Sequence, residues 1–157
     1  MITCAFEDEG KANLRHVVVR AIVEKDGKLL LEKRAQGILE AGKWCLPSGY
    51  LDRDETAIEG ILREMKEETG WEGSSPILFQ LSTVPYRPND ADRQNVAIDF
   101  IVTPVKQTGQ KDWESTDVAW IDINKLPSLE DLSFDHGKVV ASYLKYRTKP
   151  FPLPLFE

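Results

Sequence analysis

The chain has 157 residues, of which 41% are hydrophobic and 29% are charged, and its formal net charge is -6. This length and composition are those of one globular domain that is large enough to bury a substantial core. The negative charge argues against a nucleic-acid duplex or an anionic membrane as the main partner, because both bind basic surfaces. A small anionic ligand held through metal ions is compatible with it.

The cysteines and the first residues indicate a cytoplasmic protein. Cys4 and Cys45 follow no metal-ligand spacing, and a chain of this length does not depend on one disulfide. Residues 1–11 have neither the basic nor the apolar segment of a signal peptide, and no apolar run is long enough to cross a membrane. We expect one domain over residues 1–157, with its core at about 16–147 and a proline-rich tail at 149–157.

The predicted elements begin with strands. The β-branched run 16–23 is typical of a buried strand, and Asp26-Gly27 predicts a tight turn into a returning strand at 29–33. Later strands are predicted at 43–46, 77–84, 95–105 and 118–121, with a polar loop at 86–95 and a last helix at 135–147. The tail should be extended and pack on the body or on a second subunit. This order favours an α/β sandwich with a mixed sheet and helices on its faces.

An amphipathic helix is predicted between the strands at 43–46 and 77–84. Thr56 and Glu59 have the spacing of a capping box, which predicts a helix that runs to about Thr69 and stops at Gly70. The apolar side chains that share one face, and should pack on the sheet, are Ile58, Ile61, Leu62 and Met65.

Three acidic residues cluster in the second half of this helix: Glu64, Glu67 and Glu68. Glu68 falls at the edge of the apolar face, where an isolated carboxylate is costly, and the helix dipole disfavours anions in this half. Arg63 lies four residues before Glu67 and can pair with it. A solvated acidic face is the ordinary interpretation, but charge clustered in an unfavourable place favours a compensating cation. Oxygen ligands suit Mg²⁺ or Mn²⁺.

The spacing of charged residues and glycines over this stretch resembles the Nudix box. The matching residues are Gly49, Glu55, Arg63, Glu64, Met65, Glu67, Glu68 and Gly70. Two positions depart from the usual pattern: Trp71 replaces an aliphatic residue, and Ser48 stands where many relatives have a first glycine. The segments 44–47, 126–127 and 134–136 and Trp120 also look like features of the family, so the resemblance covers roughly residues 16–147.

The resemblance implies a Nudix-type α/β/α sandwich with a mixed sheet, and hydrolysis of a nucleoside diphosphate linked to another group with divalent cations. It implies that Glu64, Glu67 and Glu68 hold the metal, with Glu64 alternatively acting as the general base. Further residues implied by the box are Arg63 to orient a glutamate, Gly49 to bring the backbone close to metal or phosphate, and Glu55 and Gly70 to shape the loop and the helix. Relatives also use an acid outside the box, for which Glu114 and Asp117 are candidates.

Substrate contacts are expected around the polar loop. Tyr86 is the preferred stacking partner for a base, and Arg87 and Arg93 could meet phosphates or a ribose, although the loop could equally be only solvated. Arg34, at the end of a strand, could also reach phosphate. Other aromatic candidates, each more often a packing residue, are Trp44, Tyr50, Trp71 and Phe79. His136 is expected in the first turn of the last helix, after Asp135 as N-cap, and His16 is expected to be structural.

The sequence therefore predicts a Mg²⁺- or Mn²⁺-dependent pyrophosphatase that acts on a small nucleotide. Within that class we favour ADP-ribose or a nucleoside diphosphate sugar. The alternatives are a nucleoside triphosphate, including oxidised forms, a nucleotide sensor without turnover, and an acidic interaction helix without chemistry. The complete set of Glu64, Glu67 and Glu68 argues against the sensor. The resemblance also implies a homodimer.

Overall fold

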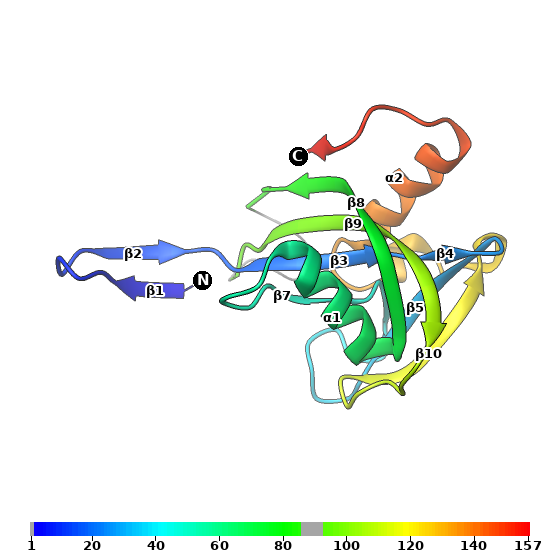
Figure 1. Ribbon diagram of the computed structural model, residues 1–157, viewed down its shortest axis with the longest axis horizontal. Helices are drawn as coiled ribbons and strands as arrows, with labels where there is room; N and C mark the ends of the chain where they lie inside the picture. The colour runs from blue at the N-terminus through cyan, green and yellow to red at the C-terminus, as the bar shows by residue number, and fades with distance from the viewer. Residues whose placement is uncertain (1, 86–92) are drawn as a thin grey trace.

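The computed structural model describes residues 2–85 and 93–157, and Figure 1 shows its elements. The strands are β1 Ile2–Ala5, β2 Lys11–Leu14, β3 Val17–Ile22, β4 Glu24–Lys25, β5 Lys28–Arg34, β6 Trp44–Cys45, β7 Ser48–Tyr50, β8 Trp71–Ser82, β9 Val96–Gln107, β10 Ser115–Asp122 and β11 Leu155–Phe156. The helices are α1 Ala57–Thr69 and α2 His136–Thr148, with single 3₁₀ turns at Ile123–Lys125 and Leu129–Asp131.

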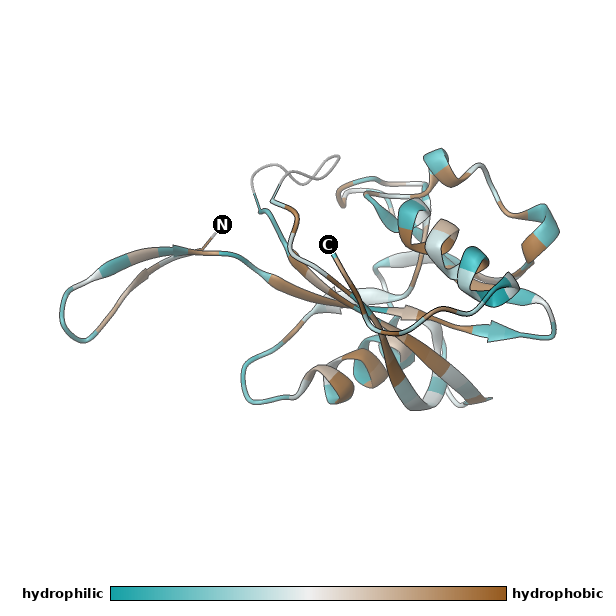
Figure 2. Ribbon diagram, turned by 90° about the horizontal axis from the view of Figure 1, so that it is seen from above, coloured by the Kyte–Doolittle hydropathy of each residue, from teal (hydrophilic) through white to brown (hydrophobic). Residues whose placement is uncertain are grey.

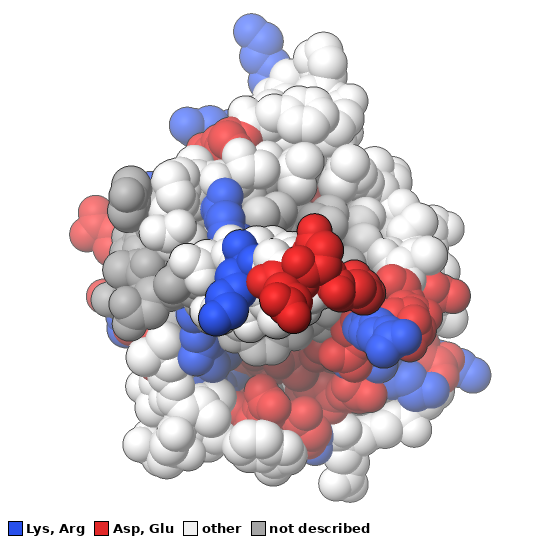
Figure 3. Space-filling view, turned by 90° about the vertical axis from the view of Figure 1, so that its left-hand side faces the viewer, with Lys and Arg blue, Asp and Glu red and all other residues white. Residues whose placement is uncertain are grey.

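The strands form a mixed five-stranded sheet, a smaller sheet and a separate ribbon. The five-stranded sheet has the order β11-β8-β9-β3-β7, in which β3 runs parallel to β9 and antiparallel to β7. The smaller sheet has the order β10-β5-β4, and β6 also pairs with β5. Ribbon β1-β2 pairs with neither sheet; it projects from the body, and its acidic turn faces the viewer in Figure 3. The sequence analysis missed this ribbon.

The core lies in two clusters, one beneath each helix. Ile61 and Met65 of α1 pack with residues of β3 and β9, including Val19 and Phe100. Helix α2 packs through a second cluster, made by Val139, Val140 and Tyr143 with Ile22, Leu29, Leu31, Leu46, Phe79 and Leu132. Figure 2 shows α1 and α2 on opposite sides of the strands. The predicted α/β fold with a mixed sheet is confirmed.

Helix α1 has the predicted limits because both of its ends are capped. Thr56 and Glu59 form the reciprocal capping box, and Gly70 ends the helix in the left-handed conformation with φ of 74°. One prediction is wrong: Ile58 is 48% exposed, because the sheet covers only the face that carries Ile61 and Met65.

Other segments also match or extend the predictions. Asp26 and Gly27 both have positive φ, at 50° and 72°, as a two-residue hairpin turn requires. Strand β8 begins at Trp71, six residues earlier than predicted. The tail packs on the body, where β11 pairs in parallel with β8. No helix among the described residues is long and apolar enough to span a membrane.

Candidate active site

A cavity of about 290 Å³ lies where α1 faces β7 and where the start of α2 meets the sheet. Its lining residues are Val18, Arg20, Arg34, Ser48, Gly49, Tyr50, Asp52, Glu64, Glu68, Arg93, Asn95, Glu114, Phe134, Asp135 and His136. Of the predicted site residues it brings together Gly49, Glu64, Glu68, Arg34, Arg93 and Glu114. Tyr86 and Arg87 lie outside the described residues.

Glu64 reaches the cavity because Gly49 leaves room for it. A Cβ atom at Gly49 would lie 2.1 Å from the Glu64 carboxylate, far inside any normal contact. Position 49 therefore requires glycine because a side chain has no space there. The backbone conformation does not require glycine, since φ of Gly49 is not positive. Burial raises the pKa of Glu64 to about 7. This carboxylate can thus change its protonation state near neutral pH.

Glu68 lies one turn further along α1 and is almost completely buried, with 3% exposure. The backbone N–H of Ser48 donates to its Oε2 at 2.7 Å. Burial raises the pKa of Glu68 well above its usual range, and the nearby Glu32 carboxylate adds to the effect. In its ionised form Glu68 therefore needs a positive partner at this place.

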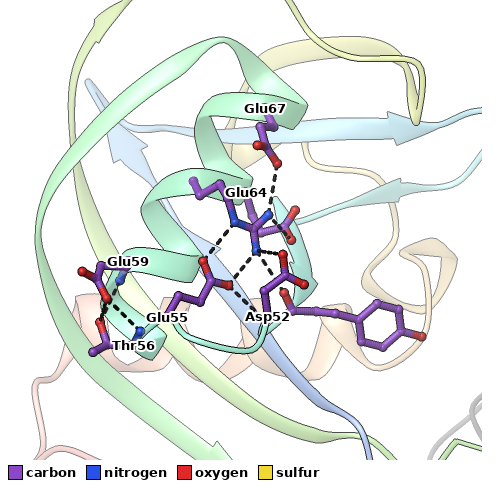
Figure 4. A network of polar contacts seen from close by, with 8 residues as sticks. Asp52, Glu55, Thr56, Glu59, Glu64 and Glu67 are labelled. Carbon is purple, nitrogen blue, oxygen red and sulfur yellow. Dashed lines mark hydrogen bonds and ion pairs between the residues drawn. The ribbon is translucent and has the colours of Figure 1, made fainter.

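Arg63 binds three acidic residues of the box, Glu55, Glu64 and Glu67, and Figure 4 shows these three carboxylates within one network of polar contacts. Its guanidinium donates to Glu55 at 2.7 and 3.0 Å, to Glu64 at 2.8 Å and to Glu67 at 3.0 Å. It also donates to the carbonyl oxygen of Tyr50 at 3.2 Å, which ties α1 to the end of β7. The hydrogen bonds to Glu55 raise the pKa of Arg63, so it remains charged. The predicted Arg63–Glu67 pair is present, and Glu67 points outward with its side chain 53% exposed.

Behind Glu68 lies a buried carboxylate that the sequence analysis missed. Glu32, on β5, is 1% exposed and accepts hydrogen bonds from the Ser115 hydroxyl and, at 3.0 Å, from the Cys45 thiol. Burial raises the pKa of both Glu32 and Cys45. The available signal was the single acidic residue that directly follows three leucines in the predicted strand 29–33.

A second buried group, also missed, forms the far wall of the cavity. Arg20 on β3 donates to both carboxylate oxygens of Asp99 on β9, at 2.5 and 3.0 Å, and to Asp135 at the start of α2. Arg20 and Asp99 are direct partners in the sheet register. Burial alone would lower the pKa of Arg20, but the two aspartates outweigh it and raise it. The available sequence signal was a single charged residue in each of two otherwise apolar strands, with opposite signs: Arg20 in one and Asp99 in the other.

Two arginines that were predicted to meet the substrate, Arg34 and Arg93, line the cavity and contact neighbouring groups. The Arg34 guanidinium lies 5.3 Å from the centre of the Phe134 ring and donates to the carbonyl oxygen of Leu39 at 2.7 Å. Arg93 donates to the Tyr50 hydroxyl at 2.8 Å.

Glu114 lines the cavity, but Asp117 is exposed and accepts a hydrogen bond from the backbone N–H of the next residue, because β10 turns it away. Asp117 is therefore not placed to act as the extra acid.

His136 begins α2 as predicted and is 4% exposed. The backbone N–H of Leu46 donates to its Nδ1 at 3.1 Å, which leaves Nε2 as the nitrogen that carries the proton in the neutral ring. Asp135 occupies the N-cap position but makes no capping hydrogen bond with its side chain, since its carboxylate binds Arg20. Both residues also line the cavity.

The carboxylates that line the cavity are chemically suited to bind a hard divalent cation. Glu64 and Glu68 present carboxylate oxygens in one cavity, beside the backbone of Gly49, and their raised pKa values show that their ionised forms lack a sufficient positive partner. Over residues 2–85 and 93–157, no three His, Cys, Asp or Glu side chains converge as a preformed metal site. Glu64 and Glu67 are instead held by Arg63, so a cation would compete with its guanidinium.

A family model described as the NUDIX domain matches residues 14–143, which is most of the chain. The chain belongs to the Nudix family. A relative named ADP-ribose pyrophosphatase, from Methanocaldococcus jannaschii, is 32% identical over 131 residues, which cover 83% of this chain and 74% of the relative. With the family and its pyrophosphatase relatives established, this Nudix protein is a pyrophosphohydrolase.

Solved structures support the Nudix fold. A Nudix hydrolase from Nitrosomonas europaea superposes with a TM-score of 0.80 at 24% identity, covering 94% of this chain and 81% of the other. An ADP-ribose pyrophosphatase from Streptococcus suis has a TM-score of 0.72 at 17% identity, and the match covers 92% of this chain and 100% of the other. At these identities the likeness concerns the fold alone.

Proposed function

We propose that this Nudix pyrophosphohydrolase cleaves the pyrophosphate of ADP-ribose or of a related nucleoside diphosphate sugar, and that it requires Mg²⁺ or Mn²⁺. The observation that carries the reaction is the pair of carboxylates, Glu64 and Glu68, directed into one cavity beside Gly49. The substrate class is supported by the name of the relative from Methanocaldococcus jannaschii.

The acidic residues of α1 act as a rigid set of oxygen ligands. A divalent cation, when bound, neutralises the phosphate oxygens and lowers the pKa of a bound water. Glu68 is fixed by the Ser48 N–H and Glu64 by Arg63, so little reorganisation accompanies the reaction. Glu67, held by the same Arg63, is the third proposed ligand. With its pKa near 7, Glu64 could alternatively take the proton of the attacking water.

Arg34 is better placed than Arg20 to meet a phosphate. Arg20 is buried and already binds two carboxylates, so its charge is fully compensated. Arg34 lines the same cavity, and its guanidinium contacts the carbonyl oxygen of Leu39 and the ring of Phe134, neither of which carries a negative charge. Arg93, beside Tyr50, supplies a second positive charge at the cavity wall.

The proposal is tested with a substrate panel in the presence and absence of Mg²⁺. The panel contains ADP-ribose, nucleotide sugars, dinucleoside polyphosphates and nucleoside triphosphates, and release of nucleoside monophosphate is measured. We expect metal-dependent AMP release from ADP-ribose to have the highest kcat/KM. Preferred cleavage of a triphosphate would overturn the substrate class, and binding without any product would favour a sensor.

The metal ligands are tested by Glu68→Gln, with Glu130→Gln as the control for an exposed glutamate. We expect Glu68→Gln to abolish turnover while the protein stays folded, because one anionic ligand is lost and a neutral amide suits the buried position. Normal activity in Glu68→Gln would refute the assignment of Glu68 as a metal ligand.

A further inference from the structure

The feature without a role in the proposed reaction is the buried carboxylate of Glu32. Its side chain does not line the cavity; it is enclosed in the smaller sheet, where β5 pairs with β10 and with β6. The three residues before it, 29–31, are completely buried leucines. Over residues 2–85 and 93–157, no ion pair joins Glu32 to a lysine or an arginine. An apolar residue would therefore serve the fold at least as well, and stability does not explain this acid.

The first hydrogen bond of Glu32 fixes the start of β10. The Ser115 hydroxyl donates to Oε2 of Glu32, and Ser115 is almost completely buried. The preceding residue is Glu114, which lines the cavity. At this point the pairing of β10 with β5 is irregular, since its register shifts between Ser115 and Asp117. Because the regular ladder is interrupted here, the bond between the two side chains helps to set where Glu114 lies.

The second hydrogen bond of Glu32 fixes the segment that holds Glu68. The Cys45 thiol donates to Oε1 of Glu32 at 3.0 Å, and Cys45 is also the partner of Glu32 in the pairing of β6 with β5. Three residues further on, the backbone N–H of Ser48 donates to the Glu68 carboxylate at 2.7 Å. The segment 45–48 is therefore tied to Glu32 at its first residue and to Glu68 at its last.

One carboxylate thus joins two parts of the chain that place acids at the cavity. Glu68 enters from α1, and Glu114 enters from the turn before β10, the strand that lies beside β5 (Figure 1). A catalytic group that is misplaced by about 1 Å can lose roughly 100-fold in rate, so metal ligands and acids need rigid support. Glu32 supplies this support from outside the cavity, because each of its oxygens accepts from a different strand.

We propose that Glu32 is a positioning residue of the pyrophosphohydrolase: its two hydrogen bonds fix the carboxylates of Glu68 and Glu114 relative to each other. Glu32 itself contacts neither the nucleotide nor the cation. The inference rests on the proposed function, in which Glu68 binds the cation, and on Glu114 as the extra acid. It predicts that loss of the Glu32 carboxylate changes the rate and the use of Mg²⁺, and not the binding of the nucleotide.

Glu32→Leu tests the proposal, because it removes both hydrogen bonds and places an apolar side chain in the core. We expect kcat for ADP-ribose in Mg²⁺ to fall roughly 10- to 100-fold, as is typical when the support of a metal ligand is lost. The Mg²⁺ concentration that gives half the maximal rate should rise, since Glu68 is held less firmly. KM for ADP-ribose should stay near the wild-type value, because Glu32 does not line the cavity. A purely structural residue would change the temperature of unfolding and leave the Mg²⁺ requirement of the folded enzyme unchanged.

Ser115 supplies a second, independent variant. Ser115→Ala removes the hydroxyl that Glu32 accepts from and should lower kcat in the same way. In the double variant Glu32→Leu, Ser115→Ala we expect the same kcat as in Glu32→Leu, because the second substitution removes a bond that is already lost. The double variant also leaves no Ser115 hydroxyl buried without a partner, so it carries the test if Glu32→Leu alone does not fold.

Glu24→Leu is the matched control. Glu24 lies on β4 in the same sheet and accepts hydrogen bonds from the Tyr143 hydroxyl at 2.7 Å and from the Arg147 guanidinium at 2.9 and 3.0 Å. None of these three residues lines the cavity. We expect Glu24→Leu to keep the wild-type kcat and Mg²⁺ dependence, although it too removes a carboxylate that binds a hydroxyl.

The outcomes separate the positioning role from the proposed function. Wild-type kcat and Mg²⁺ dependence in a folded Glu32→Leu would overturn the proposal, and so would losses from Glu32→Leu and Ser115→Ala that multiply in the double variant. If Glu68→Gln is inactive while Glu32→Leu is fully active, only the positioning role is wrong. If Glu68→Gln is active, the metal site is wrong and the positioning role is refuted with it. If another nucleotide of the substrate panel is cleaved best, it replaces ADP-ribose in these assays, and the comparison of variants is unaffected.

Discussion

Replacement of Gly49 by alanine tests how the cavity positions Glu64. The new Cβ would lie 2.1 Å from the carboxylate, whereas an ordinary contact begins near 3.4 Å, so the carboxylate must retreat by about 1.3 Å. A displacement of about 1 Å in a catalytic group can reduce the rate roughly 100-fold. We therefore expect kcat/KM to fall by about two orders of magnitude.

The stability of Gly49→Ala should change little, and this separates the effect on the site from misfolding. The φ of Gly49 is not positive, so alanine can adopt this backbone, and it loses less entropy than glycine on folding. The atom that must move is the end of a flexible side chain. We expect the free energy of unfolding to change by less than about 1 kcal/mol.

The assay pairs steady-state kinetics in Mg²⁺ with denaturant unfolding. Gly109→Ala is the control, because its new Cβ would meet its nearest atom at 3.7 Å, an ordinary contact. Gly109→Ala should have wild-type activity and stability. Wild-type activity in a folded Gly49→Ala would refute the argument that this glycine places the Glu64 carboxylate.

Three further predictions concern buried charges and the extra acid. Glu114→Gln should lower kcat at least tenfold, because Glu114 lines the cavity, while Asp117→Asn should keep wild-type kcat; equal effects would contradict these placements. Arg20→Met should reduce the free energy of unfolding by about 3–5 kcal/mol in urea titrations, because two buried carboxylates lose their shared cation, and a change below about 1 kcal/mol would refute this. In EDTA, stability should fall by about 1–2 kcal/mol as the pH rises from 4.5 to about 7, since burial raises the pKa of Glu64 above its unfolded value and the folded state then binds the proton more tightly. Glu64→Gln should weaken this pH dependence, and an unchanged profile would show that Glu64 does not cause it.

The sequence was most informative where the interactions are local. The capping box, the stop at Gly70 and the Arg63–Glu67 pair all join residues within one helix, so their spacing along the chain predicts their contact. The Asp26-Gly27 turn is equally local.

Predictions failed where neighbouring strands or a sheet edge decide the outcome. Ile58 has the spacing of a core residue, but the sheet does not extend over it. Asp117 and Glu114 are close in sequence, yet only Glu114 lines the cavity, because Glu114 lies in the turn before β10 while Asp117 lies on the strand, after an irregularity in its register.

The sequence by itself determined the Nudix box, the helix that carries it and the acidic residues that favour a cation. Only the tertiary structure decided which of these acids enter the cavity, since this depends on the approach of β7 to α1 at Gly49. It also brought together Arg20, Asp99 and Asp135 from three distant parts of the chain. Their pairing is set by strand register and helix packing, and no local pattern along the chain encodes such long-range contacts.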